Sequence, residues 1–305
     1  PKMRIIESID EMREYSQQLK RDGKTIASVD IGSFMHDGHM QLVEVAKQHS
    51  DVVIVNLEHT PEFLAFGEGD YNPYMVGDGS ISPIWEEFIS EYNLATLPND
   101  IELCKKHGVD ILFLPSMEDM YNNVSDTTIL SPLPVAETLA KIYPKHSTFS
   151  SVMVRELIIM LNILSPDISV VGQKDILQSF TLKKIINDLK YPIKLIRTPI
   201  YRNPNGLAYS SRNQYLSESE RKQATSIYQT LYEVSKWSIY PSIEKIKEHI
   251  INRIEGHVNY VSIFSIKTLQ ELSCLIEETV ILVSVTYDGI DLTDNIIIDP
   301  ERIKR

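Results

Sequence analysis

Five apolar runs of strand length, separated by stretches of helical character, constrain the fold of this chain most strongly. The runs lie at residues 25–31, 51–57, 109–115, 167–172 and 193–199. Between them, residues 151–163 and 176–189 carry apolar side chains at helical spacing. Strands that alternate with helices in this way pair in parallel, with helices on both faces of the sheet. The sequence therefore predicts an α/β fold with a Rossmann-like, doubly wound sheet of five parallel strands.

The pattern changes after about residue 200. Two helical stretches lie at residues 218–235 and 243–255. They are followed by three strand-like runs, at residues 258–265, 279–286 and 291–298. We therefore expect two domains, at residues 1–200 and 201–305, of which the second is a smaller α+β domain. We expect this second domain to act as a lid over the ligand site of the first.

Charge and cysteine content exclude several classes of function. The chain has 305 residues and a net charge of −12, which argues against binding to nucleic acid. Cys104 and Cys274 are isolated, so they fit neither a disulfide framework nor a zinc cluster and suit a reducing cytoplasm. No apolar run approaches ~18 residues, and we see no signal-peptide pattern. We therefore expect a cytoplasmic protein with no membrane partner and no nucleic-acid partner.

Two histidines lie in the turn after the first predicted strand. His36 and His39 precede residues 40–49, whose apolar spacing predicts a helix. Imidazoles and the free N–H groups of a helix N-terminus both favour phosphate, and Gly38 lets a nucleotide lie against the backbone. Two histidines at this spacing also occur in metal sites and on ordinary surfaces, so the pair alone does not decide the function.

The apolar run at residues 168–172 ends in Gly172, Gln173, Lys174 and Asp175. A buried parallel strand delivers the residues that follow it to the edge of the sheet where ligands bind. Lys174 is thus placed to bind phosphate, and Asp175 to accept hydrogen bonds from ribose hydroxyls. An ordinary solvent-exposed loop remains an equal alternative, because Lys and Asp are common in such loops.

A third polar segment contains Ser210, Ser211 and Arg212, whose hydroxyls and guanidinium suit phosphate oxygens. A separate capping box at residues 217–220 begins the next helix, so the Ser-Ser-Arg segment is not needed there. Negative charge builds on the phosphoryl oxygens and on pyrophosphate when a carboxylate attacks the α-phosphate of ATP. The three segments supply donors and cations for that charge, so they predict ATP-dependent activation of a carboxylic acid.

In their order and content, these segments resemble the pantothenate synthetases, also called pantoate–β-alanine ligases, of the HIGH-type nucleotidyltransferase superfamily. The resemblance covers nearly the whole chain, from residues 12–16 through the sequences LFLPSMEDMY, GQKD, GLAYSSRNQYL and VNYVSIFS to Asp294-Asn295. It implies an AMP-forming carboxylate–amine ligase that makes pantoyl adenylate from pantoate and ATP and then transfers the acyl group to β-alanine. It also implies Mg²⁺ with the ATP, small-molecule acid and amine partners, and a homodimer.

The resemblance also implies roles for individual residues. The phosphate-handling residues are His36, His39, Lys174, Ser210, Ser211 and Arg212. The ribose and nucleotide contacts are Gly38, Gly172 and Asp175, and Gln178 is one of two glutamines that hold pantoate. Asp70 lies where the family places acidic residues that help to hold Mg²⁺, although a solvated loop acid is an equal alternative.

The acid-binding half departs from the family pattern. Asp30 begins the segment that replaces the family's Pro-Thr-Met-Gly run. Asn56 is kept, but the second pantoate glutamine is missing, with His59 or Glu62 as the nearest candidates. The region that follows is also longer than in the family. Two interpretations stay open: a diverged pantothenate synthetase, or a relative that joins another acid to another amine.

Two further functions remain as alternatives. Residues 32–34 (GSF) resemble the GxF signature of nucleotidyltransferases that act on a phosphate acceptor, although the phenylalanine there normally lies further upstream of the first histidine. A catalytically inactive regulatory or scaffold protein is expected to lose at least one phosphate-handling residue. This chain loses none of them.

Overall fold

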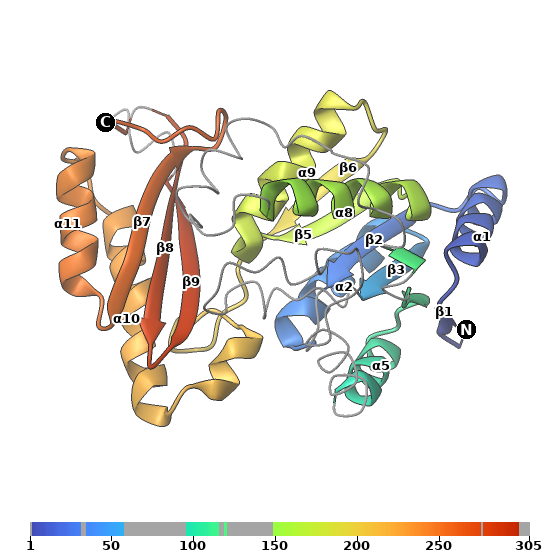
Figure 1. Ribbon diagram of the computed structural model, residues 1–305, viewed down its shortest axis with the longest axis horizontal. Helices are drawn as coiled ribbons and strands as arrows, with labels where there is room; N and C mark the ends of the chain where they lie inside the picture. Colours follow the sequence, from blue (N-terminus) through green and yellow to red (C-terminus); the bar gives the residue numbers. More distant parts are fainter. Residues whose placement is uncertain are drawn as a thin grey trace, which may run out of the picture. The chain divides into compact units, whose positions relative to one another are not determined.

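The computed structural model describes residues 2–31, 35–57, 96–115, 119–120, 149–275 and 277–298. They divide into two compact units (Figure 1). The first unit holds the described residues up to Gly172 together with Thr181–Thr198. The second unit holds Gln173–Phe180 and the described residues from Pro199 onward.

The first unit contains a parallel sheet with strands in the order β1-β4-β3-β2-β5-β6. The strands are β1 (Arg4–Ile6), β2 (Ile26–Ile31), β3 (Val52–Leu57), β4 (Ile111–Phe113), β5 (Ile168–Gly172) and β6 (Lys194–Thr198). The predicted Rossmann-like sheet is confirmed, with one strand more than expected. We missed β1 because it has only three residues, two of them exposed, and so carries almost no periodicity.

Helices cover both faces of this sheet, because side chains along a strand point alternately to opposite faces. The helices are α1 (Ile9–Arg21), α2 (Asp37–His49), α5 (Leu97–Lys106), α8 (Phe149–Leu164) and α9 (Ile176–Asp188), of which α9 crosses the unit boundary after Phe180. On one face, Ala27 and Val29 of β2 share a core with Val43 of α2. On the other, Ile26 shares a core with Met12 of α1.

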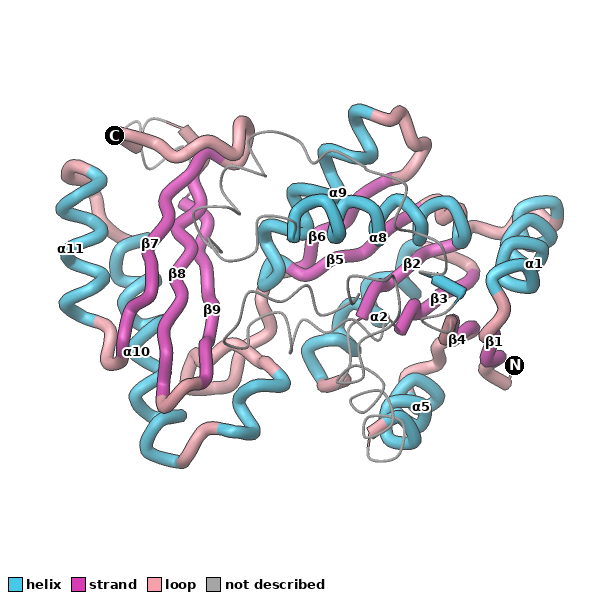
Figure 2. The backbone as a smooth tube through the Cα atoms, viewed as in Figure 1, coloured by secondary structure: helices cyan, strands magenta, loops and turns pink. Residues whose placement is uncertain are grey.

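The second unit contains an antiparallel sheet with the order β7-β8-β9. Its strands are β7 (His257–Ser265), β8 (Thr279–Tyr287) and β9 (Ile290–Ile298), and its long helices are α10 (Glu218–Ser235) and α11 (Ile243–Arg253). Figure 2 shows both helices on one side of the sheet, and Leu231 and Ile246 share a buried core with Val283. The predicted capping box at α10 is formed by Ser217 and Glu220. The expected smaller α+β region is thus confirmed.

Among the helices that the structure describes, none is long and apolar enough to cross a membrane.

Candidate active site

The two histidines cap α2. His36 is the N-cap residue, with an extended backbone (φ −145°, ψ 174°), and its Nδ1 accepts a hydrogen bond from the Gly38 N–H at 3.1 Å. In return, Nδ1 of His39 accepts from the His36 N–H at 3.2 Å. The pair therefore forms a reciprocal capping box built from imidazoles.

This arrangement fixes the tautomer of both rings. A ring nitrogen that accepts a backbone N–H bond carries no proton, so each neutral imidazole bears its proton on Nε2. The two rings stack with centroids 3.8 Å apart and planes 20° apart. Each of the two stacked rings thus carries an Nε2–H donor at the start of α2, where the helix dipole also favours negative charge.

Helix α5 supports the residue that precedes this pair. The N–H of Met35 donates to Oδ1 of Asp100 at 3.1 Å, and the Asp100 side chain is buried. The Sγ of Cys104, one turn further along α5, lies 3.4 Å from Sδ of Met35. Burial and, to a lesser degree, the charge of Asp100 raise the pKa of the Cys104 thiol to about 12. Helix α5 and its role were not predicted from the sequence, although Pro98 near its start and the spacing of Ile101 and Cys104 are signals of a helix.

A carboxyl and an amide meet near the carboxyl ends of β2 and β3. Asp30 pairs with Asn56 in the sheet register, and the two side chains approach to 3.5 Å between Nδ2 of Asn56 and Oδ1 of Asp30. Asn56 is fully buried. Burial raises the pKa of the Asp30 carboxyl from 3.8 to about 6, and the hydrogen bond from Asn56 opposes this rise. Asn56 was predicted from the sequence to bind the acid. Asp30 was recognised only as the start of a segment that differs from the family pattern.

The second unit contains the lysine and the Ser-Ser-Arg segment. Lys174 lies in the short helix η2 (Gln173–Asp175), directly after β5 in the chain. Ser210 caps the short helix η3 (Ser211–Tyr215), and its Oγ accepts from the Arg212 N–H at 3.2 Å. Nη1 of Arg212 donates to the Asp291 carbonyl at 2.8 Å.

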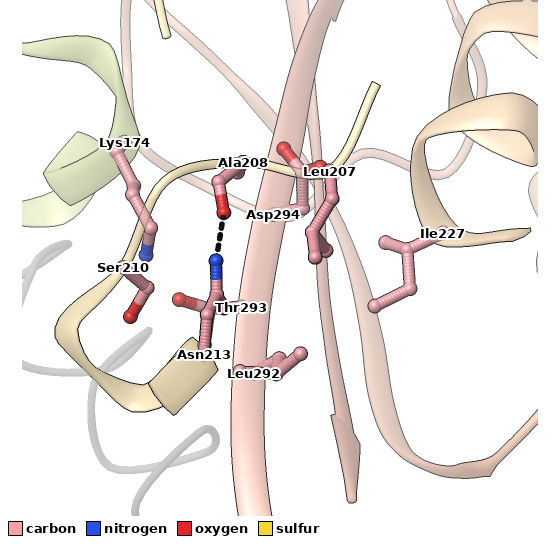
Figure 3. Close-up of a pocket in the computed structure, with 9 residues that line it drawn as sticks. All are labelled: Lys174, Leu207, Ala208, Ser210, Asn213, Ile227, Leu292, Thr293 and Asp294. Carbon is pink, nitrogen blue, oxygen red and sulfur yellow. Dashed lines mark hydrogen bonds between the residues drawn. The ribbon is translucent and has the colours of Figure 1, made fainter. Parts of the chain in front are cut away.

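A small pocket in this unit is lined by both Lys174 and Ser210 (Figure 3). In Figure 3 the Lys174 side chain extends along the loop toward Ser210, and Asn213 lies beside them. Nδ2 of Asn213 donates to the Ala208 carbonyl at 3.0 Å, which holds η3 against the preceding loop. The pocket thus combines an ammonium group with a hydroxyl, a combination that suits an anionic oxygen.

The predicted residues divide between the two units. His36, Gly38, His39, Asn56 and Gly172 belong to the first unit; Lys174, Asp175, Gln178, Ser210, Ser211 and Arg212 belong to the second. His59, Glu62 and Asp70 lie outside the described residues. Within the part of the chain that the structure describes, no group of three or more His, Cys, Asp or Glu residues could hold a metal ion.

Comparison with known proteins identifies the family. The model of the pantoate-β-alanine ligase family matches residues 4–75 and 86–297. A pantothenate synthetase from Thermoanaerobacter sp. (strain X514) is 31% identical over 302 residues, covering 97% of this chain and 98% of the relative. One from Thermotoga neapolitana is 32% identical over 311 residues, covering 97% of this chain and 100% of the relative.

Solved structures agree. The pantothenate synthetase from Thermus thermophilus has a TM-score of 0.76 at 26% identity and covers 96% of this chain and 99% of its own. A pantoate-β-alanine ligase from Francisella tularensis, complexed with β,γ-ATP and β-alanine, has a TM-score of 0.70 at 26% identity, with 97% of each chain covered. The chain therefore belongs to the pantoate–β-alanine ligase family of AMP-forming ligases, as its sequence predicted.

Proposed function

We propose that this chain ligates pantoate to β-alanine with ATP, through an enzyme-bound pantoyl adenylate. The observation that carries the proposal is family membership over nearly the whole chain, at 31% identity to a pantothenate synthetase. The phosphate-favouring geometry of the paired histidines and of the Lys174 pocket supports the same reaction. The complex of the Francisella relative with β,γ-ATP and β-alanine supports the choice of nucleotide and amine.

In the first step, a carboxylate oxygen of pantoate bonds to the α-phosphorus of ATP, and the bond from that phosphorus to the β-phosphate bridging oxygen breaks. Negative charge grows on the α-phosphoryl oxygens and on departing pyrophosphate. The proposed phosphate-handling groups donate to these oxygens or offset their charge, and they are His36, His39, Lys174, Ser210, Ser211 and Arg212. The two imidazoles suit this role because both carry Nε2–H donors in the neutral state.

In the second step, the β-alanine nitrogen bonds to the acyl carbon, AMP leaves, and the nitrogen loses a proton to form the amide. No side chain needs to become a covalent nucleophile, so positioning and charge stabilisation supply most of the catalysis. We propose that Gly38, Gly172 and Asp175 contact the nucleotide. The acid would be held by Asn56 and Gln178, with His59 or Glu62 as the further candidate.

Mg²⁺ is proposed to accompany ATP, where it offsets charge on the phosphates. This ion binds mainly through substrate phosphates and one or two carboxylates, so a single protein carboxylate such as Asp70 would suffice. We further propose that residues 1–200 and 201–305 are the two domains of the enzyme. It would act as a homodimer in the reducing cytoplasm, which suits the free thiols of Cys104 and Cys274.

One observation favours a second candidate function, a ligase of the same class that joins another acid or amine. Asp30 places a carboxyl near the end of β2, beside the fully buried Asn56. A carboxylate near the acid site would repel a substrate carboxylate, although it could accept a hydroxyl or hold an ammonium.

A screen of acid-dependent ATP–pyrophosphate exchange with Mg²⁺ separates these functions. It covers pantoate and a panel of small hydroxy, keto and amino acids, with Lys174→Ala as the control that should lose nearly all exchange. Exchange with pantoate, followed by pantothenate formation when β-alanine is added, supports the first proposal. Exchange with another acid alone supports the second, and pyrophosphate release that needs a phosphate acceptor and no acid would indicate a nucleotidyltransferase.

A further inference from the structure

One buried side chain of β9 holds the turn that carries Lys174. Nδ2 of Asn295 donates to the carbonyl of Gln173 at 3.0 Å and to the carbonyl of Lys174 at 3.3 Å. Its Oδ1 accepts from Nε2 of Gln173 at 3.1 Å. Asn295 is fully buried, and all three residues belong to the second unit. A single amide thus uses both of its functions on η2.

The turn needs this support because η2 is a short 3₁₀ helix. Helices of this kind have poorer hydrogen-bond geometry than α-helices and seldom hold their shape alone. Only an amide at position 295 can donate to the two carbonyls and also accept from Gln173. A carboxylate of the same size would place an oxygen against the carbonyl oxygens, and an alanine would leave the buried groups unpaired.

The neighbouring residue of β9 fixes Asn295 and the loop before Ser210. Both oxygens of Asp294 accept from Arg202, at 2.6 and 2.8 Å, and Oδ1 also accepts the Asn295 N–H at 2.7 Å. Nη1 of Arg202 donates to the Gly206 carbonyl at 3.1 Å, within the turn that leads to Ser210. Strand β9 therefore contacts η2, which carries Lys174, and through Asp294 and Arg202 it also holds the turn that leads to Ser210.

We propose that Asn295 is a positioning residue for Lys174: its amide fixes the η2 backbone so that the lysine ammonium reaches the phosphates of ATP. This inference rests on the proposed function, in which Lys174 stabilises charge during adenylation. A lysine side chain has a flexible four-carbon stem, so the ammonium loses conformational entropy when it is held in one place. The position of the backbone decides which sites the ammonium can reach without a further entropic cost. Since a displacement of ~1 Å can cost about 100-fold in rate, loss of the amide should slow adenylation about 10- to 100-fold.

The test uses the full chain and pantoate-dependent ATP–pyrophosphate exchange, together with thermal melting. The variants are Asn295→Ala, Asn295→Asp, Lys174→Ala and the double variant Asn295→Ala/Lys174→Ala. Thr279→Val is the matched control: Thr279 is fully buried in β8 of the same sheet, but its Oγ1 donates to the Glu277 carbonyl instead of η2. High enzyme concentration keeps the residual rate of Lys174→Ala measurable.

If Asn295 acts through Lys174, its substitution should lower the exchange rate strongly only in a protein that still contains Lys174. We expect Asn295→Ala and Asn295→Asp each to lower the exchange rate at least 10-fold, and Asn295→Ala to lower it less than about 3-fold in the Lys174→Ala background. Thr279→Val should keep the wild-type rate at a comparable loss of melting temperature.

An equal proportional loss in both backgrounds, or an equal loss in Thr279→Val, would mean a structural role and overturn the proposal. So would an unchanged rate in folded Asn295→Asp. If Lys174→Ala itself keeps full activity, the proposed role of Lys174 fails instead, and the positioning role fails with it. The two failures are therefore distinguishable.

Discussion

The partly buried carboxyl of Asp30 should make the stability of the first unit depend on pH in a way that Asp30→Asn removes. Burial raises the pKa of this carboxyl from its ordinary 3.8 to about 6. The native state therefore holds the Asp30 proton more tightly than the unfolded chain does. Folding is favoured while the carboxyl stays protonated, and this advantage disappears as the pH rises through the native pKa. Asparagine has the same shape and no charge, so the variant lacks this pH dependence.

The size of the effect follows from the two pKa values. A rise from 3.8 to about 6 corresponds to about 3 kcal/mol, at about 1.4 kcal/mol for each pH unit. Part of this difference is already present at pH 4, so relative to the wild type Asp30→Asn should gain about 2–3 kcal/mol of unfolding free energy between pH 4 and pH 7. Most of the gain falls between pH 4 and pH 6, and the difference is flat above about pH 7.

Hydrogen exchange measured by mass spectrometry on peptides from β2 and β3 reports this region separately from the second unit. At each pH from 4 to 8, the ratio of wild-type and variant exchange rates gives the difference in opening free energy. This rate ratio should grow about 60- to 100-fold over the range. Glu14→Gln, on the exposed side of α1, is the control and should change the difference by less than about 0.5 kcal/mol throughout. A difference that stays constant or falls as the pH rises would refute the reasoning.

Three other predictions concern single contacts. Asp294→Asn removes the charged partner of Arg202, and the side chains of Asp294 and Arg202 are only 4% and 16% exposed. Because this leaves a largely buried guanidinium without its carboxylate, urea denaturation should show the second unit destabilised by about 3–5 kcal/mol. Thiol titration of the native protein should detect Cys274, which is exposed. It should detect Cys104 only after unfolding, because burial raises the pKa of the Cys104 thiol to about 12 and so suppresses the reactive thiolate. Ser217→Ala removes the side-chain cap of α10 and should cost about 1 kcal/mol in the same denaturation assay.

Local sequence signals predicted most of the secondary structure. The predicted helix at residues 218–235 has the same bounds as α10, because a capping box fixes its start and apolar spacing fixes its face. The predicted strand at residues 25–31 differs from β2 by one residue. In contrast, β1 has three residues and gains its stability from pairing with β4, and such pairing leaves no local signal.

The candidate site was predictable only for groups that carry recognisable chemistry. His36, Lys174 and Arg212 belong to short motifs whose residue types suit phosphate. Asn295 and Asp100 support such motifs from strands or helices more than 60 positions away, at residue separations of 122 and 65. These contacts depend on tertiary packing, which the order of residues along the chain does not reveal.

The effect of Asp30 on stability depends on its surroundings, because burial raises the pKa of its carboxyl. A carboxyl that lowers stability by about 3 kcal/mol at neutral pH is expected to persist where it serves a function, because strained or perturbed groups gather at functional sites. Its place near the carboxyl end of a central parallel strand is where ligands of such sheets bind. We therefore expect Asp30→Asn to be more stable at pH 7 yet slower in acid-dependent pyrophosphate exchange, with the rank order of acids altered. A variant that gains stability and keeps both the rate and the rank order would show that Asp30 has no part in choosing the acid.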